Sequence, residues 1–74
     1  MDFKYEIKKS LGTISSAKSG WTKELNLISW NDKEAKYDIR DWDPTHTKMG
    51  KGITLTKDEI SKLYELIKDI NFEE

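Results

Sequence analysis

Cysteine is absent from the 74-residue sequence, and histidine occurs only once, at His46. The chain can therefore form no disulfide and no thiolate metal site, and a zinc site would depend on carboxylates. Hydrophobic residues make up 35% of the sequence and charged residues 36%, which predicts one small domain over residues 1–74 with a thin core. So small a core usually needs a further source of stability, and we expect oligomerisation to supply it.

Long apolar runs are absent as well. No stretch approaches the length needed to span a membrane, and residues 1–5 lack the apolar segment of a signal peptide. We therefore expect a soluble, cytoplasmic protein that makes no contact with a membrane.

The sequence does contain the alternation of apolar and polar residues that is typical of β-strands. The expected strands are residues 3–14, 21–30, 35–42 and 51–55. A bend is expected at Gly12. A bulge or strong twist is expected within residues 21–30, where neither parity is cleanly apolar. Short connections, among them an Asn31-Asp32-Lys33 hairpin turn, predict an antiparallel sheet.

A helix should follow the last strand. Thr56 and Glu59 have the spacing of a capping box, which predicts a helix over residues 57–70 and an α+β fold with the order β-β-β-β-α. The apolar stripe of this helix is broader than one face of a small sheet requires, so we expect a second copy of the helix to cover part of it. The residues assigned to this homodimer interface are Leu63, Tyr64, Leu66, Ile67 and Ile70.

The third predicted strand carries the most informative alternation. Tyr37 and Ile39 share one parity, which we assign to the core. The opposite face then carries Lys36, Asp38, Arg40 and Trp42. A surface that combines two cations with an indole is more than solvation requires, and it predicts a binding face.

Three tryptophans, Trp21, Trp30 and Trp42, are many for so thin a core. A single tryptophan is more often buried than exposed. All three are hard to bury here, and Trp30, beside a turn, and Trp42, at a strand end, are the best candidates for exposure. For Trp42 the sequence leaves two roles open, a stacking surface for bases or a plug at the edge of the core. Accessible indoles beside cations suit the stacking of unpaired bases and the binding of phosphates. The cations on or beside the sheet are Lys23, Lys33, Lys36, Arg40, Lys48 and Lys51.

The distribution of charge permits such binding, although the net charge of the chain is −1. Residues 56–74 contain three lysines and six acids, a net of −3, whereas residues 1–55 carry ten bases and eight acids, a net of +2. Binding responds to the local potential rather than to the total charge. Because the excess is small, nucleic-acid binding would have to depend on stacking as well as on charge.

Three acids, Asp38, Asp41 and Asp43, raise the alternative of a Mg²⁺-dependent nuclease. Asp38 and Asp41 point to opposite faces of a regular strand, however, and Arg40 and Lys36 are available to pair with Asp38. We therefore expect structural ion pairs rather than a metal site.

Two further motifs offer little chemistry. His46 has no nucleophile and orienting acid beside it, so we expect an exposed histidine rather than a catalytic one. Gly50-Lys51-Gly52 has too few glycines for a phosphate-binding loop. Its glycines are expected to permit a close approach of the backbone, with Lys51 presented between them for a phosphate contact.

The order and spacing of these segments resemble a known family. Tyr37-Asp38-Ile39-Arg40-Asp41-Trp42 is followed by Lys51-Gly52-Ile53-Thr54-Leu55 and then at once by the capped helix. Together with residues 21–26 and 28–31, this pattern is similar to the single-stranded-DNA-binding transcriptional coactivators of the positive-cofactor-four (Sub1-like) type, particularly their small bacterial YdbC-type members. The resemblance implies a curved four-stranded sheet, a dimer formed largely through the helices, and single-stranded DNA lying across both sheets.

The resemblance also implies roles for single residues. Arg40 and Lys51 match DNA contacts of the family, and Trp30 resembles its stacking aromatic near the second hairpin, with Lys33 as a turn cation. Trp42 is similar to the aromatic after the Ile-Arg-acid motif. The full predicted nucleic-acid-binding set is Lys23, Asn26, Trp30, Lys33, Lys36, Arg40, Trp42, Lys48 and Lys51, in which Asn26 adds a hydrogen bond.

The expected function is sequence-tolerant binding of single-stranded DNA by a homodimer, in transcription, replication or repair. No enzymatic activity, cofactor or metal is expected, and the cytoplasmic location would include association with the nucleoid. Single-stranded RNA as the ligand stays open, as does a protein-interaction module that docks another protein on exposed tryptophans. Proteins of transcription or repair are further candidate partners.

Overall fold

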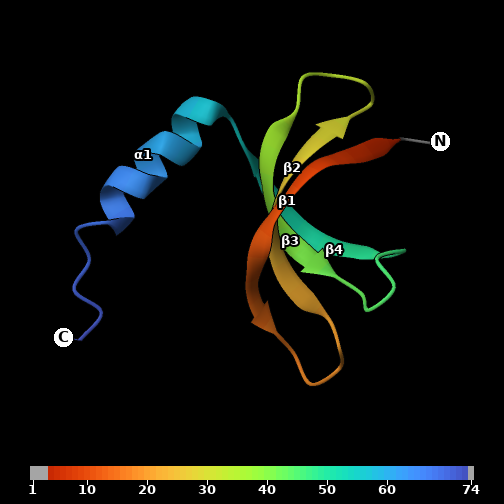
Figure 1. Cartoon of the computed structure of the whole chain (residues 1–74), viewed down its shortest axis with the longest axis horizontal. Coiled ribbons are helices and arrows are strands. Elements are labelled where there is room, and N and C mark those ends of the chain that lie inside the picture. Colours follow the sequence, from red (N-terminus) through yellow and green to blue (C-terminus); the bar gives the residue numbers. More distant parts are fainter. Residues whose placement is uncertain (1–3, 74) are drawn as a thin grey trace.

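The predicted order of four strands and one helix is confirmed by the computed structural model, which describes residues 4–73 (Figure 1). The elements are β1 (Tyr5–Ser16), β2 (Thr22–Trp30), β3 (Lys36–Trp42), β4 (Met49–Leu55) and α1 (Lys57–Ile67). Neighbouring strands pair antiparallel in the order β1-β2-β3-β4, so the chain has an α+β fold with one open sheet. Phe3, at the start of the first predicted strand, lies outside the described residues.

The helix begins where the sequence predicts and ends earlier. At its start, the Glu59 amide donates to Thr56 Oγ1 at 3.2 Å and the Thr56 amide donates to Glu59 Oε1 at 2.8 Å, which is the predicted capping box. The helix ends at Ile67 rather than at residue 70. Its last hydrogen bond is donated by the Lys68 amide to the Tyr64 carbonyl. The last turn of the helix has no basic residue to complement its dipole.

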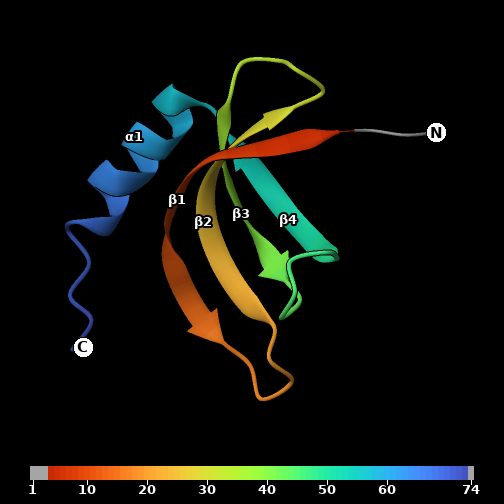
Figure 2. The ribbon, with the colours of Figure 1, turned by 45° about the vertical axis from the view of Figure 1, so that its right-hand side comes forward.

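The first strand produces most of the sheet's irregularity. Lys8, Leu11 and Ile14 are extra residues of β1 that have no opposite residue in the register with β2, so each forms a bulge. The bend expected at Gly12 falls in this bulged segment. Of the bulge or strong twist expected within residues 21–30, the structure has the twist (Figures 1 and 2), because β2 itself pairs with β3 in continuous register. Bulges increase local twist, and Figures 1 and 2 show a strongly twisted and curved sheet.

The turn between β2 and β3 is the predicted hairpin. Asn31 and Asp32 have φ angles of 52° and 64°, and the Lys33 amide donates to the Trp30 carbonyl at 3.0 Å. Two successive positive φ angles are those of a type I′ turn, which matches the twist of the strands. The turn places Lys33 close to Trp30 in the chain and in space.

The last strand lies unusually close to β3. It begins at Met49 rather than at residue 51, because Met49 already pairs with Trp42. A Cβ atom on Gly52 would collide with Arg40 Cβ and with the Ile39 carbonyl oxygen, so no side chain fits there. The predicted close backbone approach is therefore confirmed at Gly52.

The sheet has two faces of different character. The helix face, which lies toward α1, carries Leu25, Leu27, Tyr37, Ile39 and Leu55. The opposite side, here called the tryptophan face, carries Glu24, Asn26, Ile28, Trp30, Asp38, Arg40 and Trp42. Tyr37 and Ile39 lie on the helix face but remain half-buried. Among residues 4–73, the buried hydrophobic side chains are Ile28 and Trp42, both on the tryptophan face.

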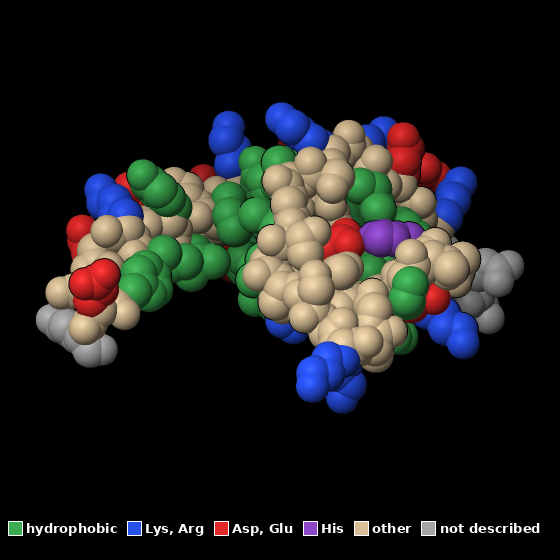
Figure 3. Space-filling view, turned by 60° about the horizontal axis from the view of Figure 1, so that its bottom comes forward, with side chains coloured by type: hydrophobic (Ala, Val, Ile, Leu, Met, Phe, Trp, Pro, Cys, Tyr) green, Lys and Arg blue, Asp and Glu red, His purple; other side chains and the backbone are tan. Residues whose placement is uncertain are grey.

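A groove separates α1 from the helix face. Its lining is almost wholly apolar and consists of Ile14, Leu25, Ile39, Ile60, Leu63, Tyr64 and Ile67. Figure 3 shows hydrophobic side chains on both sides of this hollow, and no helix residue is buried. With 11 residues and a polar side, α1 is too short and too polar to cross a membrane, and the described part of the chain has no other helix that could do so.

Candidate nucleic-acid interface

Four rings form a continuous row on the tryptophan face. Tyr5 lies 5.6 Å from Trp30 and 5.7 Å from Trp42 between ring centroids, and Trp42 stacks on His46 at 5.6 Å with an interplanar angle of 22°. We call Trp30, Tyr5, Trp42 and His46 the aromatic row. Tilted and offset ring pairs at these separations are attractive.

Trp42 is completely buried within this row, with an exposed fraction of 0%. Of the two roles that the sequence leaves open for Trp42, a stacking surface or a plug at the edge of the core, this burial favours the plug. The physical reason is its cover, since Tyr5 from β1 and His46 from the loop before β4 lie against the same indole. Trp42 plugs the edge of the core, whereas Trp30 at the other end of the row remains half-buried.

Arg40 lies against Trp30, with its Cζ atom 4.9 Å from the ring centroid, a cation–π distance. Its Nε and Nη2 donate to the two oxygens of Asp38 at 2.7 and 2.9 Å. The ion pair expected between Asp38 and Arg40 is thus confirmed. The Arg40 side chain is only 15% exposed and Asp38 is fully buried, so the pair belongs to the interior of the face.

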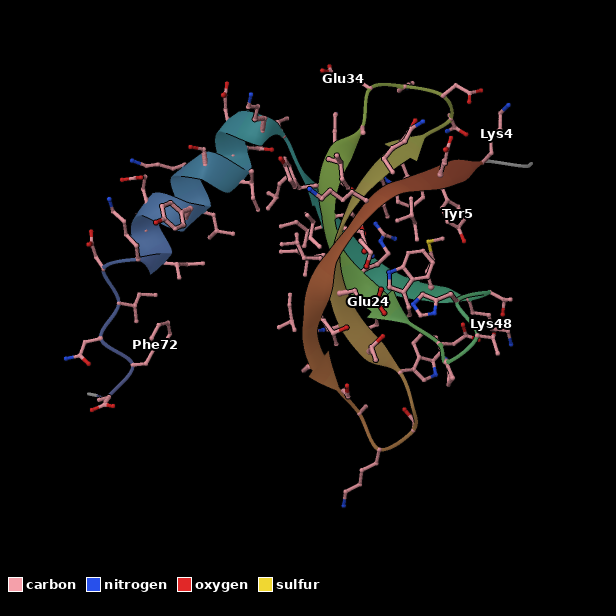
Figure 4. The ribbon with its side chains drawn as sticks, viewed as in Figure 1. Lys4, Tyr5, Glu24, Glu34, Lys48 and Phe72 are labelled. Atoms are coloured by element: carbon pink, nitrogen blue, oxygen red, sulfur yellow. The ribbon has the colours of Figure 1, made fainter. Side chains whose placement is uncertain are left out.

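Sequence reasoning missed Glu24 and His46, which close the other end of the face. His46 Nε2 lies 2.8 Å from Glu24 Oε2, and Glu24 also accepts from Thr22 Oγ1 at 2.6 Å and from Asn26 Nδ2 at 3.3 Å. Figure 4 shows Tyr5, Glu24 and Lys48 on the side of the sheet away from α1. The sequence held one signal of this arrangement: Glu24 has the same parity in β2 as Ile28 and Trp30. That parity turns its carboxylate inward, where it needs a hydrogen-bonding partner.

The loop that carries His46 is ordered by Asp43. Asp43 Oδ1 accepts from the amides of Thr47 and Lys48 at 2.9 and 3.1 Å, and the hydroxyl of Thr45 donates to Oδ2 at 3.0 Å. The amide of Lys48, with further help from Thr45 and Thr47, holds the pKa of Asp43 below its ordinary value. His46 adopts a left-handed backbone, with φ of 59°, at the tip of this loop.

Burial acts to raise the pKa of Glu24, but hydrogen bonds from Thr22, His46 and Asn26 outweigh it, so the pKa lies below the ordinary 4.5. Glu24 therefore stabilises the fold above that value, and the contribution is lost as the pH falls through the lower, folded-state pKa. When the pH falls from 6 to 3, the unfolding free energy of the parent should decrease more than that of Glu24→Gln. We expect the two decreases to differ by on the order of 1 kcal/mol.

Urea denaturation at several pH values measures this difference. Glu34→Gln, which removes the charge of an exposed loop acid, is the control and should follow the parent curve. Parallel pH profiles for the parent and Glu24→Gln would show that the ionised carboxylate of Glu24 makes no net contribution to stability.

The cations of the predicted binding set differ in whether an acid neutralises them. Lys23 pairs with Asp41 at 2.9 Å. Within residues 4–73, no ion pair is made by the exposed Lys33, Lys36, Lys48 or Lys51. Asn26 is 1% exposed and donates to Glu24, so its side chain is not accessible for the expected hydrogen bond to a ligand.

The three acids considered for a metal site are separated. Asp38 pairs with Arg40, Asp41 pairs with Lys23, and Asp43 orders its own loop. Over the described range 4–73, no three acidic or histidine side chains converge as metal ligands. Asp41 and Asp38 indeed lie on opposite faces, since Lys23 and Asp41 are opposite each other in the register and share the parity of Leu25.

Comparison with known proteins agrees with this architecture. The model of the family described as Transcriptional Coactivator p15 (PC4) matches residues 17–66, a stretch that runs from the turn before β2 to the last turn of α1. An uncharacterized protein of Treponema pallidum (strain Nichols) is 47% identical over 72 residues, which cover 97% of this chain and 85% of the relative. The matched stretch includes Trp30, Arg40 and Lys51, so the resemblance drawn from the sequence is confirmed. The chain belongs to the family of the transcriptional coactivator p15 (PC4).

Proposed function

We propose that this chain binds single-stranded DNA as a homodimer, with little preference for sequence. The observation that carries the proposal is the half-buried Trp30, which is held by Arg40 and Tyr5 next to a turn that exposes Lys33. A fixed indole offers a flat surface on which any base can stack, provided that the base is unpaired. Membership of the PC4 family supports the same ligand.

Charge on the exposed lysines would complete the site. Lys33, Lys36, Lys48 and Lys51 have no acidic partner within residues 4–73 and can therefore offer their full charge to phosphates. Lys33 lies in the turn that follows Trp30, and Lys48 lies in the loop that carries His46, so these two charges flank the aromatic row; Lys51 follows within β4. Positive charges on both sides of a stacking surface suit a single strand of DNA that crosses the sheet.

The homodimer is supported by the unfilled apolar side of α1. Tyr64, Leu66, Ile67 and Ile70 are all exposed, and the groove between α1 and the helix face is apolar. A second copy would cover both. The two sheets of one dimer would also let a single DNA strand occupy two sites, which raises the overall affinity without any new contact.

Fluorescence anisotropy with labelled oligo-dT tests the proposal. We expect binding to the single strand and much weaker binding to a duplex of equal length. If about three phosphates are neutralised, the affinity should fall about 100-fold for a tenfold rise in salt. Competition with oligo-U in the same assay compares RNA with DNA. Absence of binding at low salt, or equal binding to the duplex, would contradict the proposed function.

A further inference from the structure

We propose that Arg40 serves the single-strand site by positioning Trp30, that Asp38 fixes Arg40 in that role, and that the phosphates are bound by exposed lysines instead. The proposal rests on the proposed function. It reassigns Arg40, for which the sequence resemblance implied a direct DNA contact.

The first observation is that all three nitrogens of Arg40 are already occupied. Nε and Nη2 form a two-pronged ion pair with Asp38 at 2.7 and 2.9 Å, which is the edge that an arginine would offer to a phosphate. Nη1 lies 3.4 Å from the Gly50 carbonyl oxygen and 3.6 Å from Met49 Sδ. A phosphate that took the Nε and Nη2 edge would have to displace Asp38, which is built into the sheet.

The second observation is the state of Asp38. The carboxylate is fully buried, and besides Arg40 it accepts from Thr54 Oγ1 of β4 at 3.2 Å. If Arg40 turned away to a phosphate, Asp38 would remain as a buried charge without its counter-charge, which is strongly unfavourable. Asp38 therefore holds Arg40 in place and cancels its charge.

The third observation is that the fixed guanidinium of Arg40 lies against Trp30. Its Cζ atom lies 4.9 Å from the centre of the Trp30 ring, and Tyr5 contacts the same indole at 5.6 Å. Trp30 is thus held by two neighbours while still half-buried rather than covered. An indole that is already fixed loses less conformational freedom when a base stacks on it, so binding is tighter.

Gly52 makes this arrangement feasible. Because a side chain at Gly52 would collide with Arg40 and with the backbone of β3, only glycine lets β4 approach so closely. That approach brings the Thr54 hydroxyl to Asp38 and the Gly50 carbonyl to Arg40. Gly52, which the sequence predicted to permit a close backbone approach, therefore also supports the ion pair.

The test separates positioning from phosphate binding by the salt dependence of oligo-dT affinity. Arg40→Lys keeps the charge but loses the planar, two-pronged geometry. We expect it to weaken binding about three- to tenfold at every salt concentration, with the slope of log K against log salt unchanged. Lys51→Gln is the matched comparison and should reduce the slope by about 0.7, the value for one phosphate contact on a single strand.

A second variant, Asp38→Asn, keeps the shape of the side chain and removes its charge. With Arg40 no longer neutralised, we expect the slope to steepen by about 0.7. If Arg40→Lys binds like the parent and Arg40→Gln reduces the slope by about 0.7, Arg40 is a phosphate contact and the positioning role is refuted while the proposed function stands. If the parent itself does not bind oligo-dT, both proposals fail. Should Asp38→Asn not fold, the Arg40→Lys and Arg40→Gln slopes still decide.

Discussion

Replacing Trp30 by alanine is expected to weaken oligo-dT binding by about fivefold to 150-fold, because one stacked base contributes about 1–3 kcal/mol. Trp30 is the tryptophan of the aromatic row that combines partial exposure with a fixed orientation, since Arg40 and Tyr5 hold it. The measurement is anisotropy with oligo-dT, together with quenching of tryptophan fluorescence. Circular dichroism should show that the variant retains the sheet.

Two further variants sharpen this prediction. Trp30→Phe keeps an aromatic face and should recover most of the affinity. Trp21→Ala removes a tryptophan outside the aromatic row and should bind nearly as well as the parent. If Trp30→Ala binds oligo-dT as tightly as the parent, Trp30 is not the stacking residue, and the lysines alone would have to explain the affinity.

The parts of the fold that depend on neighbouring residues were predictable from the sequence. The capping box at Thr56 and Glu59 places two groups three residues apart, and the Asn31-Asp32 turn is favoured by residues that tolerate positive φ. Strand alternation is equally local. Such features need no knowledge of which strands meet, and the structure has them where the sequence predicts.

The burial of the two faces was not predictable in the same way. Alternation correctly puts Asp38, Arg40 and Trp42 on one side of β3, but it does not say which side is covered. The cover comes from Tyr5 and His46, which are distant in the sequence, and the path of β1 depends on three bulges. For this reason, the sequence left open whether Trp42 is accessible or buried, and the structure has it in the core.

The candidate site shows the same division. Trp30 and Lys33 follow from the turn between β2 and β3, which local residues determine. The occupation of Arg40 by Asp38 and the contact of His46 with Glu24 join residues across strands, and residue types alone do not reveal them. Asn26, chosen for its hydrogen-bonding amide, is likewise used inside the sheet.

The largest effect on stability is expected from the helix surface. Among residues 4–73, the buried hydrophobic side chains are only Ile28 and Trp42, which is too small a core for a stable single chain of this length. The apolar groove beside α1 and the exposed Leu66 and Ile70 point to a second copy as the missing cover. We therefore expect the parent to sediment at twice the 8.7 kDa of one chain.

Leu66→Lys tests this expectation sharply, because Leu66 is 60% exposed and does not line the groove within its own chain. In a monomer, a lysine near the end of the helix should be neutral or slightly stabilising. In a dimer it would bury two charges, and we expect dissociation and a melting temperature lower by roughly 10–20 °C. Ser61→Lys, which adds the same charge on another side of α1, is the control.

Dissociation should also weaken DNA binding, because a strand can no longer occupy two sites on one particle, and we expect a loss of at least about tenfold at equal chain concentration. Sedimentation, thermal melts at several protein concentrations and anisotropy measure the three effects. A parent that sediments as one chain, with a melting temperature independent of concentration and unchanged by Leu66→Lys, would contradict the dimer. In that case Ile28 and Trp42, with the hydrogen-bonded polar side chains around them, would be enough to hold the fold.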